Sequence, residues 1–81
     1  MTEPSRGRLR WQCRRGMKEL DFLLERWLDL CYPGADEKRR EAFQRLLEAQ
    51  DPELVAWLFE RQRPADPAMA ALVDELLERP R

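Results

Sequence analysis

Histidine is absent from this chain of 81 residues, and several patterns that mark enzymes are missing with it. Without histidine the chain lacks the side chain that most readily exchanges protons near neutral pH, and also the commonest metal ligand. The GxGxxG and GxxxxGK[ST] patterns of nucleotide sites and the GxSxG pattern of serine hydrolases are absent as well. We therefore expect a binding protein with no catalytic site, no metal site and no cofactor of its own.

Cysteine is scarce, since Cys13 and Cys31 are the only two and do not form a CxxC pair. Their spacing does not match a structural zinc site. No secretory segment precedes them, and no apolar run approaches the roughly 20 residues needed to cross a bilayer. A single disulfide is conceivable, but we favour two reduced, packed thiols in a soluble cytosolic protein that does not insert into a membrane.

Charged residues are abundant at 38%, beside 43% hydrophobic residues and only three glycines. This mixture, rich in leucine, glutamate and arginine, favours helices with solvated outer faces. A chain this short encloses one small core, so we expect a single domain over residues 1–81. The net charge is −1, yet five arginines fall within the first sixteen residues. Such a basic end can steer association with an acidic protein, a nucleic acid or a membrane surface.

Apolar residues recur at helical spacing along the whole chain, which predicts an all-α, compact bundle of five short helices. The expected helices run from Ser5 to about Arg14, from Met17 to about Tyr32, from about Asp36 to Ala49, from Asp51 towards Gln62, and from Asp66 to a point before Pro80. Residues 54–59 are apolar nearly all round, which predicts that the fourth helix lies centrally among its neighbours.

Helix starts are marked by capping residues, and the end of the fourth helix is not marked. Asp51 and Asp66 each precede a proline that fits the first helical turn, so we expect both aspartates to be N-caps. A glycine or asparagine would ordinarily close the fourth helix near Gln62 and Arg63, and neither is present.

The aromatic residues divide between core and surface. Trp27 and Trp57 fall on apolar faces and are expected in the core, whereas Trp11 lies off the first helix's apolar face and could belong to either. Phe22 and Leu30 fall outside the apolar stripe of the second helix. Either a further neighbour covers them or they form an exposed contact surface.

Charged, glycine and aromatic residues crowd together between Trp11 and Asp21, at the junction of the first two helices. On a structural interpretation, Gly16 ends the first helix in a left-handed conformation, Arg14 and Arg15 complement its negative end, and Glu19 complements the start of the next helix. On a functional interpretation, this segment binds a specific partner.

The segment Arg15-Gly16-Met17-Lys18-Glu19 resembles the RGxxE signature of the SdhE/succinate dehydrogenase assembly factor 2 family. RGxxE alone is short, but it stands here within a longer similar pattern from Trp11 to Asp21. Other segments are also similar to the family, so that the resemblance extends over about residues 8–78: Phe43–Glu48, Asp51–Leu58 and Pro64–Asp66.

The resemblance implies a five-helix FAD assembly factor that binds the flavoprotein subunit of succinate dehydrogenase, and in bacteria often that of fumarate reductase. It would promote covalent attachment of FAD to a histidine of that subunit, so the FAD would belong to the partner. No long presequence rich in arginine and serine precedes the pattern, so we expect a monomeric member in the bacterial cytoplasm.

The matched signature implies that Arg15, Gly16 and Glu19 lie at the partner interface, with Arg14, Met17 and Asp21 as weaker neighbours. Trp11 is a further candidate contact. Glu19 either binds the partner or orients Arg15, and the second role requires that Gly16 does not break the helix between them.

Three other functions stay open from the residues. A nucleic-acid-binding helical domain would use the basic end, although the acidic remainder of the chain opposes it. An adaptor or antitoxin-like protein would bind an unrelated protein through the same fold. An enzyme that binds free flavin would quench flavin fluorescence on titration.

Overall fold

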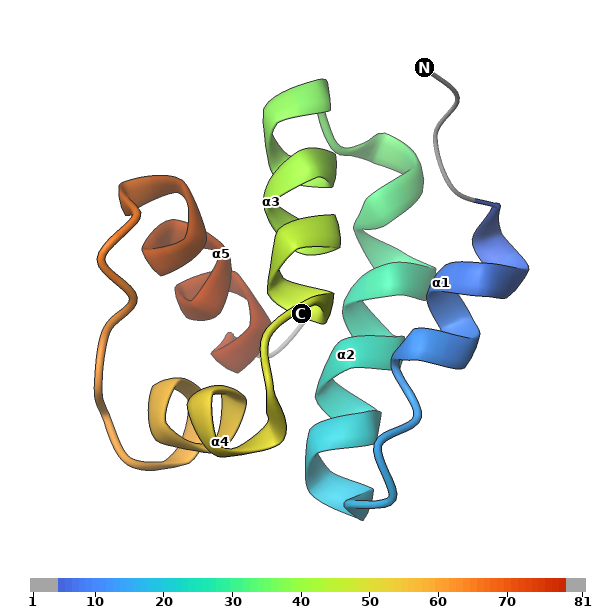
Figure 1. Cartoon of the computed structure of the whole chain (residues 1–81). Coiled ribbons are helices and arrows are strands. Elements are labelled where there is room, and N and C mark those ends of the chain that lie inside the picture. The colour runs from blue at the N-terminus through green and yellow to red at the C-terminus, as the bar shows by residue number, and fades with distance from the viewer. Residues whose placement is uncertain (1–4, 79–81) are drawn as a thin grey trace.

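The computed structural model describes residues 5–78 as five α-helices and one turn of 3-10 helix, with no strand among these residues (Figure 1). The helices are α1 (Arg6–Gln12), α2 (Lys18–Leu30), α3 (Glu37–Leu47), α4 (Asp51–Phe59) and α5 (Pro67–Leu77), and the 3-10 turn η1 is Tyr32–Gly34. This confirms the predicted all-α class and the five helices. The boundaries shift by a few residues, as frayed helix ends commonly do.

The helices enclose one core, with α3 lying between α2 and α5 in Figure 1. Helix α3 packs against α1 and α5, and α2 contacts α1, α4 and α5. Helix α4 lies at the lower edge of the view, so the prediction of a central fourth helix is wrong. Only Leu54 and Leu58 of α4 are buried, and Phe59 is 40% exposed. The apolar surface of α4 is therefore partly exposed to solvent and not covered on all sides.

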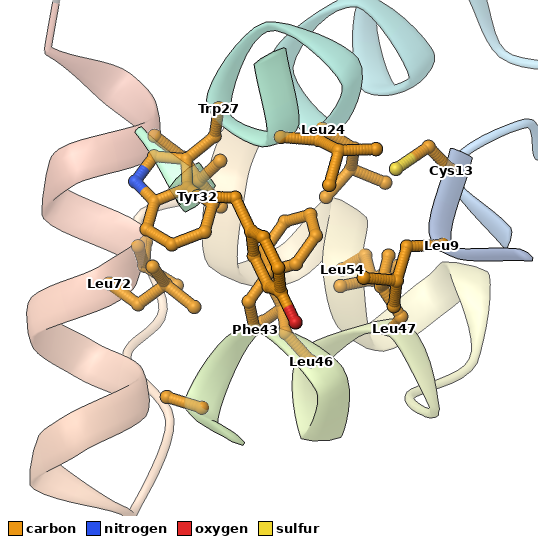
Figure 2. Packing of buried hydrophobic residues seen from close by; sticks show 14 of the residues in the cluster. Leu9, Cys13, Leu24, Trp27, Tyr32, Phe43, Leu46, Leu47, Leu54 and Leu72 are labelled. Carbon is orange, nitrogen blue, oxygen red and sulfur yellow. The ribbon is translucent and has the colours of Figure 1, made fainter. Parts of the chain in front are cut away.

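The core is built around a stack of aromatic rings (Figure 2). Trp27 of α2 stacks on Phe43 of α3 with 4.7 Å between ring centroids, and Tyr32 packs edge-on to Trp27. The core position expected for Trp27 is confirmed, and Trp57 is half-buried against the same core. Truncation of such a buried ring costs about 3–5 kcal/mol, so this stack is a major source of stability in a small domain.

Three helices begin at a residue whose side chain caps the first turn, and for Asp66 this confirms the prediction. The side chain of Ser5 accepts from the Arg8 N–H at 3.2 Å, and that of Asp66 accepts from the Ala68 N–H at 2.9 Å. Asp36 caps α3 in the same way. Each of these bonds satisfies a backbone donor that the helix itself leaves without a partner.

The predicted cap of α4 is wrong, because Gln50 and not Asp51 holds the N-cap position. The Gln50 backbone N–H donates to the Glu53 carboxylate at 3.2 Å, as in a capping box. Asp51 is the first residue of the helix, and its carboxylate binds Arg15 from another part of the chain. The Asp51 carboxylate, which the sequence pattern assigned to capping, thus makes a tertiary contact with Arg15.

The end of α4 is closed without glycine. Arg61 adopts a left-handed backbone conformation with φ of 61°, and the Gln62 N–H then donates to the Ala56 carbonyl at 3.0 Å. A left-handed conformation costs an ordinary residue about 1–2 kcal/mol. The turn after α4 therefore forms without glycine, and the left-handed backbone of the exposed Arg61 carries the conformational cost.

The two cysteines are free thiols, Cys13 buried and Cys31 half-buried. Burial and, to a smaller extent, the nearby Glu25 carboxylate raise the pKa of the Cys13 thiol to about 12. Cys13 is therefore a protonated packing residue at neutral pH, in agreement with the expectation of a packed thiol. Among the helices within residues 5–78, none is long and apolar enough to span a bilayer.

Candidate functional site

The signature segment forms the loop between α1 and α2. Gly16 has φ of 88°, in the left-handed region that glycine enters without strain. No atom lies within 4 Å of a Cβ built at Gly16, so glycine is required here by the backbone and not by crowding. The left-handed conformation expected for Gly16 is confirmed, and it separates the end of α1 at Gln12 from the start of α2 at Lys18.

Asp21 holds this loop from the first turn of α2. Its carboxylate accepts from the backbone N–H of Arg15 at 2.8 Å and from that of Gly16 at 3.3 Å. The carboxylate also lies near the positive end of the α2 dipole, which favours its charge. The structure thus gives Asp21 an intrachain role, in which it fixes the backbone of the signature.

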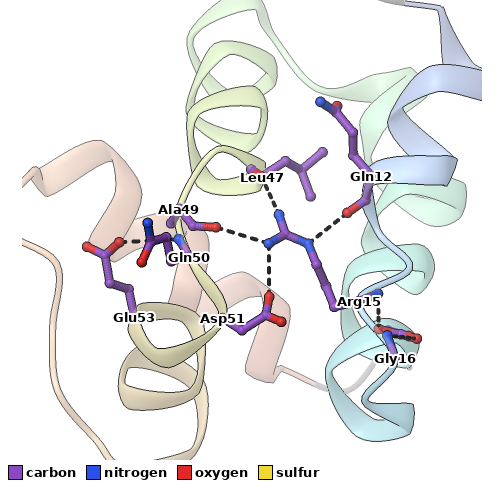
Figure 3. A network of polar contacts seen from close by, with 9 residues as sticks. Gln12, Arg15, Gly16, Leu47, Ala49, Gln50, Asp51 and Glu53 are labelled. Carbon is purple, nitrogen blue, oxygen red and sulfur yellow. Dashed lines mark hydrogen bonds and ion pairs between the residues drawn. The ribbon is translucent and has the colours of Figure 1, made fainter.

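The Arg15 side chain turns inward and joins the loop to the α3–α4 turn (Figure 3). Its Nε donates to the Gln12 carbonyl at 2.9 Å, and its Nη1 donates at 3.0 Å to both the Ala49 carbonyl and the Asp51 carboxylate. Its Nη2 donates to the Leu47 carbonyl. Only 15% of the Arg15 side chain is exposed. Arg15 therefore complements the carbonyl ends of both α1 and α3.

Glu19 does not orient Arg15. Within residues 5–78 the Glu19 carboxylate makes no hydrogen bond or ion pair, and all the acceptors of Arg15 belong to other residues. Gly16 breaks the helix between the two, which removes the four-residue proximity that such a contact needs. Glu19 is exposed, and of the two roles considered for it, contact with a partner stays a prediction.

The remaining candidates point to solvent. Trp11 is 77% exposed and Met17 is 39% exposed, which answers the open question about Trp11 in favour of the surface. Arg14 is exposed beside them, and its side chain has no partner within residues 5–78. The signature thus divides into Arg15 and Asp21, which hold the loop, and Trp11, Arg14, Met17 and Glu19, which it presents.

An open groove of about 520 Å³ runs between the α1–α2 loop and the α3–α4 turn. Trp11 and Arg14 line one wall, and Glu48 and Gln50 line the other. The second wall was not predicted, because nothing in the sequence relates these residues to a loop more than thirty positions earlier. Arg15 also lines the groove, and its hydrogen bonds connect the two sides.

A smaller apolar hollow of about 340 Å³ lies next to Glu19 and is lined by Lys18, Phe22 and Phe59, among others. Phe22 is 60% exposed, with the Arg26 guanidinium 5.3 Å from its ring centroid. Of the two alternatives for Phe22, exposure on the surface is therefore correct. An exposed aromatic ring beside a free carboxylate gives a mixed surface that suits protein contact.

The basic end of the chain is partly neutralised by α2. Arg10 pairs with Asp29 and with Glu25, the latter at 3.5 Å, and Arg6 lies 3.8 Å from Asp29. These pairs reduce the positive potential that a nucleic-acid surface would need. Within residues 5–78 no three histidine, cysteine, aspartate or glutamate side chains gather as a metal site requires.

Comparison with known proteins bears on what this surface recognises. Residues 7–80 match the family model described as the flavinator of succinate dehydrogenase. A protein of Methylococcus capsulatus named FAD assembly factor SdhE is 51% identical over 88% of this chain and 86% of its own length. Proteins with the same name from Idiomarina loihiensis and Colwellia psychrerythraea are 42% and 41% identical, over 89% and 98% of this chain and 80% and 87% of their own lengths.

Proposed function

The chain belongs to the family of succinate dehydrogenase flavinators, the FAD assembly factors, and from this premise we propose that it binds the flavoprotein subunit of succinate dehydrogenase and promotes covalent attachment of FAD to that subunit. The flavoprotein subunit of fumarate reductase is a second proposed partner. The FAD and the histidine that receives it belong to the partner. The chain acts as an assembly factor, most simply as a monomer in the bacterial cytoplasm, where the thiols of Cys13 and Cys31 stay reduced.

The observation that carries this proposal is the division of the signature into supporting and presented residues. Arg15 and Asp21 are fixed by intrachain hydrogen bonds, so the loop keeps its shape before any partner arrives. Glu19, Arg14 and Trp11 are left exposed with unused polar groups or apolar area. A preformed surface of this kind binds without a large ordering cost, which suits recognition of a partner protein.

A protein without reactive groups can promote a reaction on its partner only through differential binding. If it binds the arrangement in which the acceptor histidine meets the flavin ring more tightly than other arrangements, it raises the population of that arrangement. Correct orientation of two reacting groups alone accelerates a reaction by several orders of magnitude. The binding energy therefore has to come from exposed groups such as Glu19 and Trp11.

The test is co-expression of the cognate flavoprotein subunit with and without this chain, followed by in-gel fluorescence of the denatured subunit. We expect covalent flavin to rise with the wild-type chain and to stay at the background level with Glu19→Ala. The matched control is Glu41→Ala, an exposed carboxylate on α3 outside both hollows, which should behave as wild type. Unchanged flavin together with no association between the two proteins would reject the proposal and favour an adaptor for another partner.

A further inference from the structure

The guanidinium of Arg15 binds the α3–α4 turn on both of its sides and in its middle (Figure 3). It contacts the Leu47 carbonyl before the turn, the Ala49 carbonyl within it and the Asp51 carboxylate after it. With the further bond to Gln12, four of the hydrogen bonds that its five N–H donors allow are made inside the chain. Little donor capacity is left for a partner.

The position of the turn decides whether the groove exists. Glu48 and Gln50 are exposed residues of the turn and form the wall opposite Trp11 and Arg14. No other hydrogen bond from a side chain of the α1–α2 loop reaches the turn within residues 5–78, so Arg15 is the polar link that sets the separation of the two walls.

We propose that Arg15 is a positioning residue whose guanidinium fixes the α3–α4 turn against the signature loop, and that Glu48 and Gln50 on this turn form the second wall of the partner-binding surface. This inference rests on the proposed function and deepens it. The occupant of the groove is a segment of the flavoprotein subunit. Arg15 acts through the turn, and Glu48 and Gln50 make the contact.

A change of charge on the second wall can separate a positioning role in the fold from direct contact with the partner. The Glu48 side chain is exposed and makes no hydrogen bond or ion pair within residues 5–78, so we expect its replacement to leave the fold unchanged. Glu41 is likewise exposed on α3 but does not line the groove. Glu48→Lys and Glu41→Lys therefore make the same change in charge at sites inside and outside the surface.

The experiment measures the affinity of purified variants for the purified flavoprotein subunit, together with amide hydrogen exchange of residues 48–53 in the free chain. Arg15→Ala should accelerate exchange in this segment, because the turn loses three of its anchors. It should also weaken binding by about tenfold or more at a temperature where the variant is fully folded. Glu48→Lys should weaken binding to a similar extent with an unchanged melting temperature, and Glu41→Lys should not.

The double variant gives the decisive readout. If Arg15 acts through the turn, Glu48→Lys should have a smaller effect on binding in the Arg15→Ala background, because the wall is already displaced. Full additivity, or a Glu48→Lys variant that binds as wild type, would overturn the inference. Should Arg15→Ala fail to fold, Arg15→Lys, which keeps the charge but loses the planar fork, takes its place in the cycle.

Failure of the inference and failure of the proposed function have different signatures. A wild-type chain that binds no flavoprotein subunit overturns both. A wild-type chain that binds normally while Arg15→Ala binds equally well, even with faster exchange in residues 48–53, overturns only the positioning role.

Discussion

Replacement of Arg15 by alanine removes the side chain that ties the α1–α2 loop to the α3–α4 turn. Hydrogen bonds to a charged group contribute about 1.5–3 kcal/mol, and a partly buried acceptor left without a partner costs about 1 kcal/mol more. The Asp51 carboxylate is 42% exposed, so its share of the ion pair is small. Water also reaches the freed carbonyls in the open groove, and we expect a net loss of about 2–4 kcal/mol in the free energy of unfolding.

This loss is large for a domain of this size. A chain of 81 residues is expected to have a free energy of unfolding of about 4–12 kcal/mol. Each kcal/mol shifts the melting temperature of a small domain by about 4–8 °C. Arg15→Ala should therefore lower the melting temperature by about 10–25 °C while leaving the protein folded at low temperature.

The assay is urea unfolding followed by far-ultraviolet circular dichroism, with Arg14→Ala as the matched control. Arg14 is the neighbouring arginine, exposed and without a side-chain partner within residues 5–78, so its loss should change the free energy of unfolding by less than about 0.5 kcal/mol. Equal unfolding midpoints for the two variants would refute the assignment of Arg15 to the fold, since the two substitutions remove the same charge from adjacent positions.

Four further substitutions test the backbone and the buried thiol. Gly16→Ala should lower the free energy of unfolding by about 1–2 kcal/mol, because the backbone φ at this position is 88°. Gly7→Ala, at an exposed position of α1, should raise it by up to about 1 kcal/mol, because alanine favours a helix more than glycine does. Similar urea midpoints for the two variants would contradict this reasoning. Arg61→Gly should raise the free energy of unfolding by up to about 1 kcal/mol, because it relieves the left-handed conformation, and a lower urea midpoint would oppose it. Burial raises the pKa of Cys13 from 9.0 to about 12, so the unfolded chain loses this proton first and stability should fall as the pH rises from about 9 to 12. In Cys13→Ser, the free energy of unfolding from urea titrations should fall less steeply with pH across that range. The same dependence on pH in the variant and the wild type would exclude the thiol as the cause.

Local patterns were sufficient for several features whose partners lie within a few positions, although the capping box of Gln50 and Glu53 was missed. Asp66 caps its helix as predicted because its carboxylate accepts a hydrogen bond from a backbone amide two residues later. The left-handed Gly16 was likewise evident from its place between two apolar periodic segments. These features depend on short-range geometry that the sequence contains in full.

Local patterns failed where a distant residue decided the outcome. Asp51 has the form of an N-cap, but Arg15 lies 36 positions away and binds its carboxylate. The inward direction of Arg15 was not predicted for the same reason, since its acceptors on the α3–α4 turn are invisible without the fold. The left-handed Arg61 had no marker, because neither glycine nor asparagine stands at this turn.

A reconstitution from purified components tests the proposed function most directly. The apo flavoprotein subunit of succinate dehydrogenase is mixed with FAD, with and without this chain, and covalent flavin is followed over time by fluorescence of the denatured subunit. We expect that the wild-type chain accelerates covalent attachment, that Glu19→Ala does not, and that no flavin stays with the chain itself. Equal rates of attachment with and without the chain would contradict the proposed function.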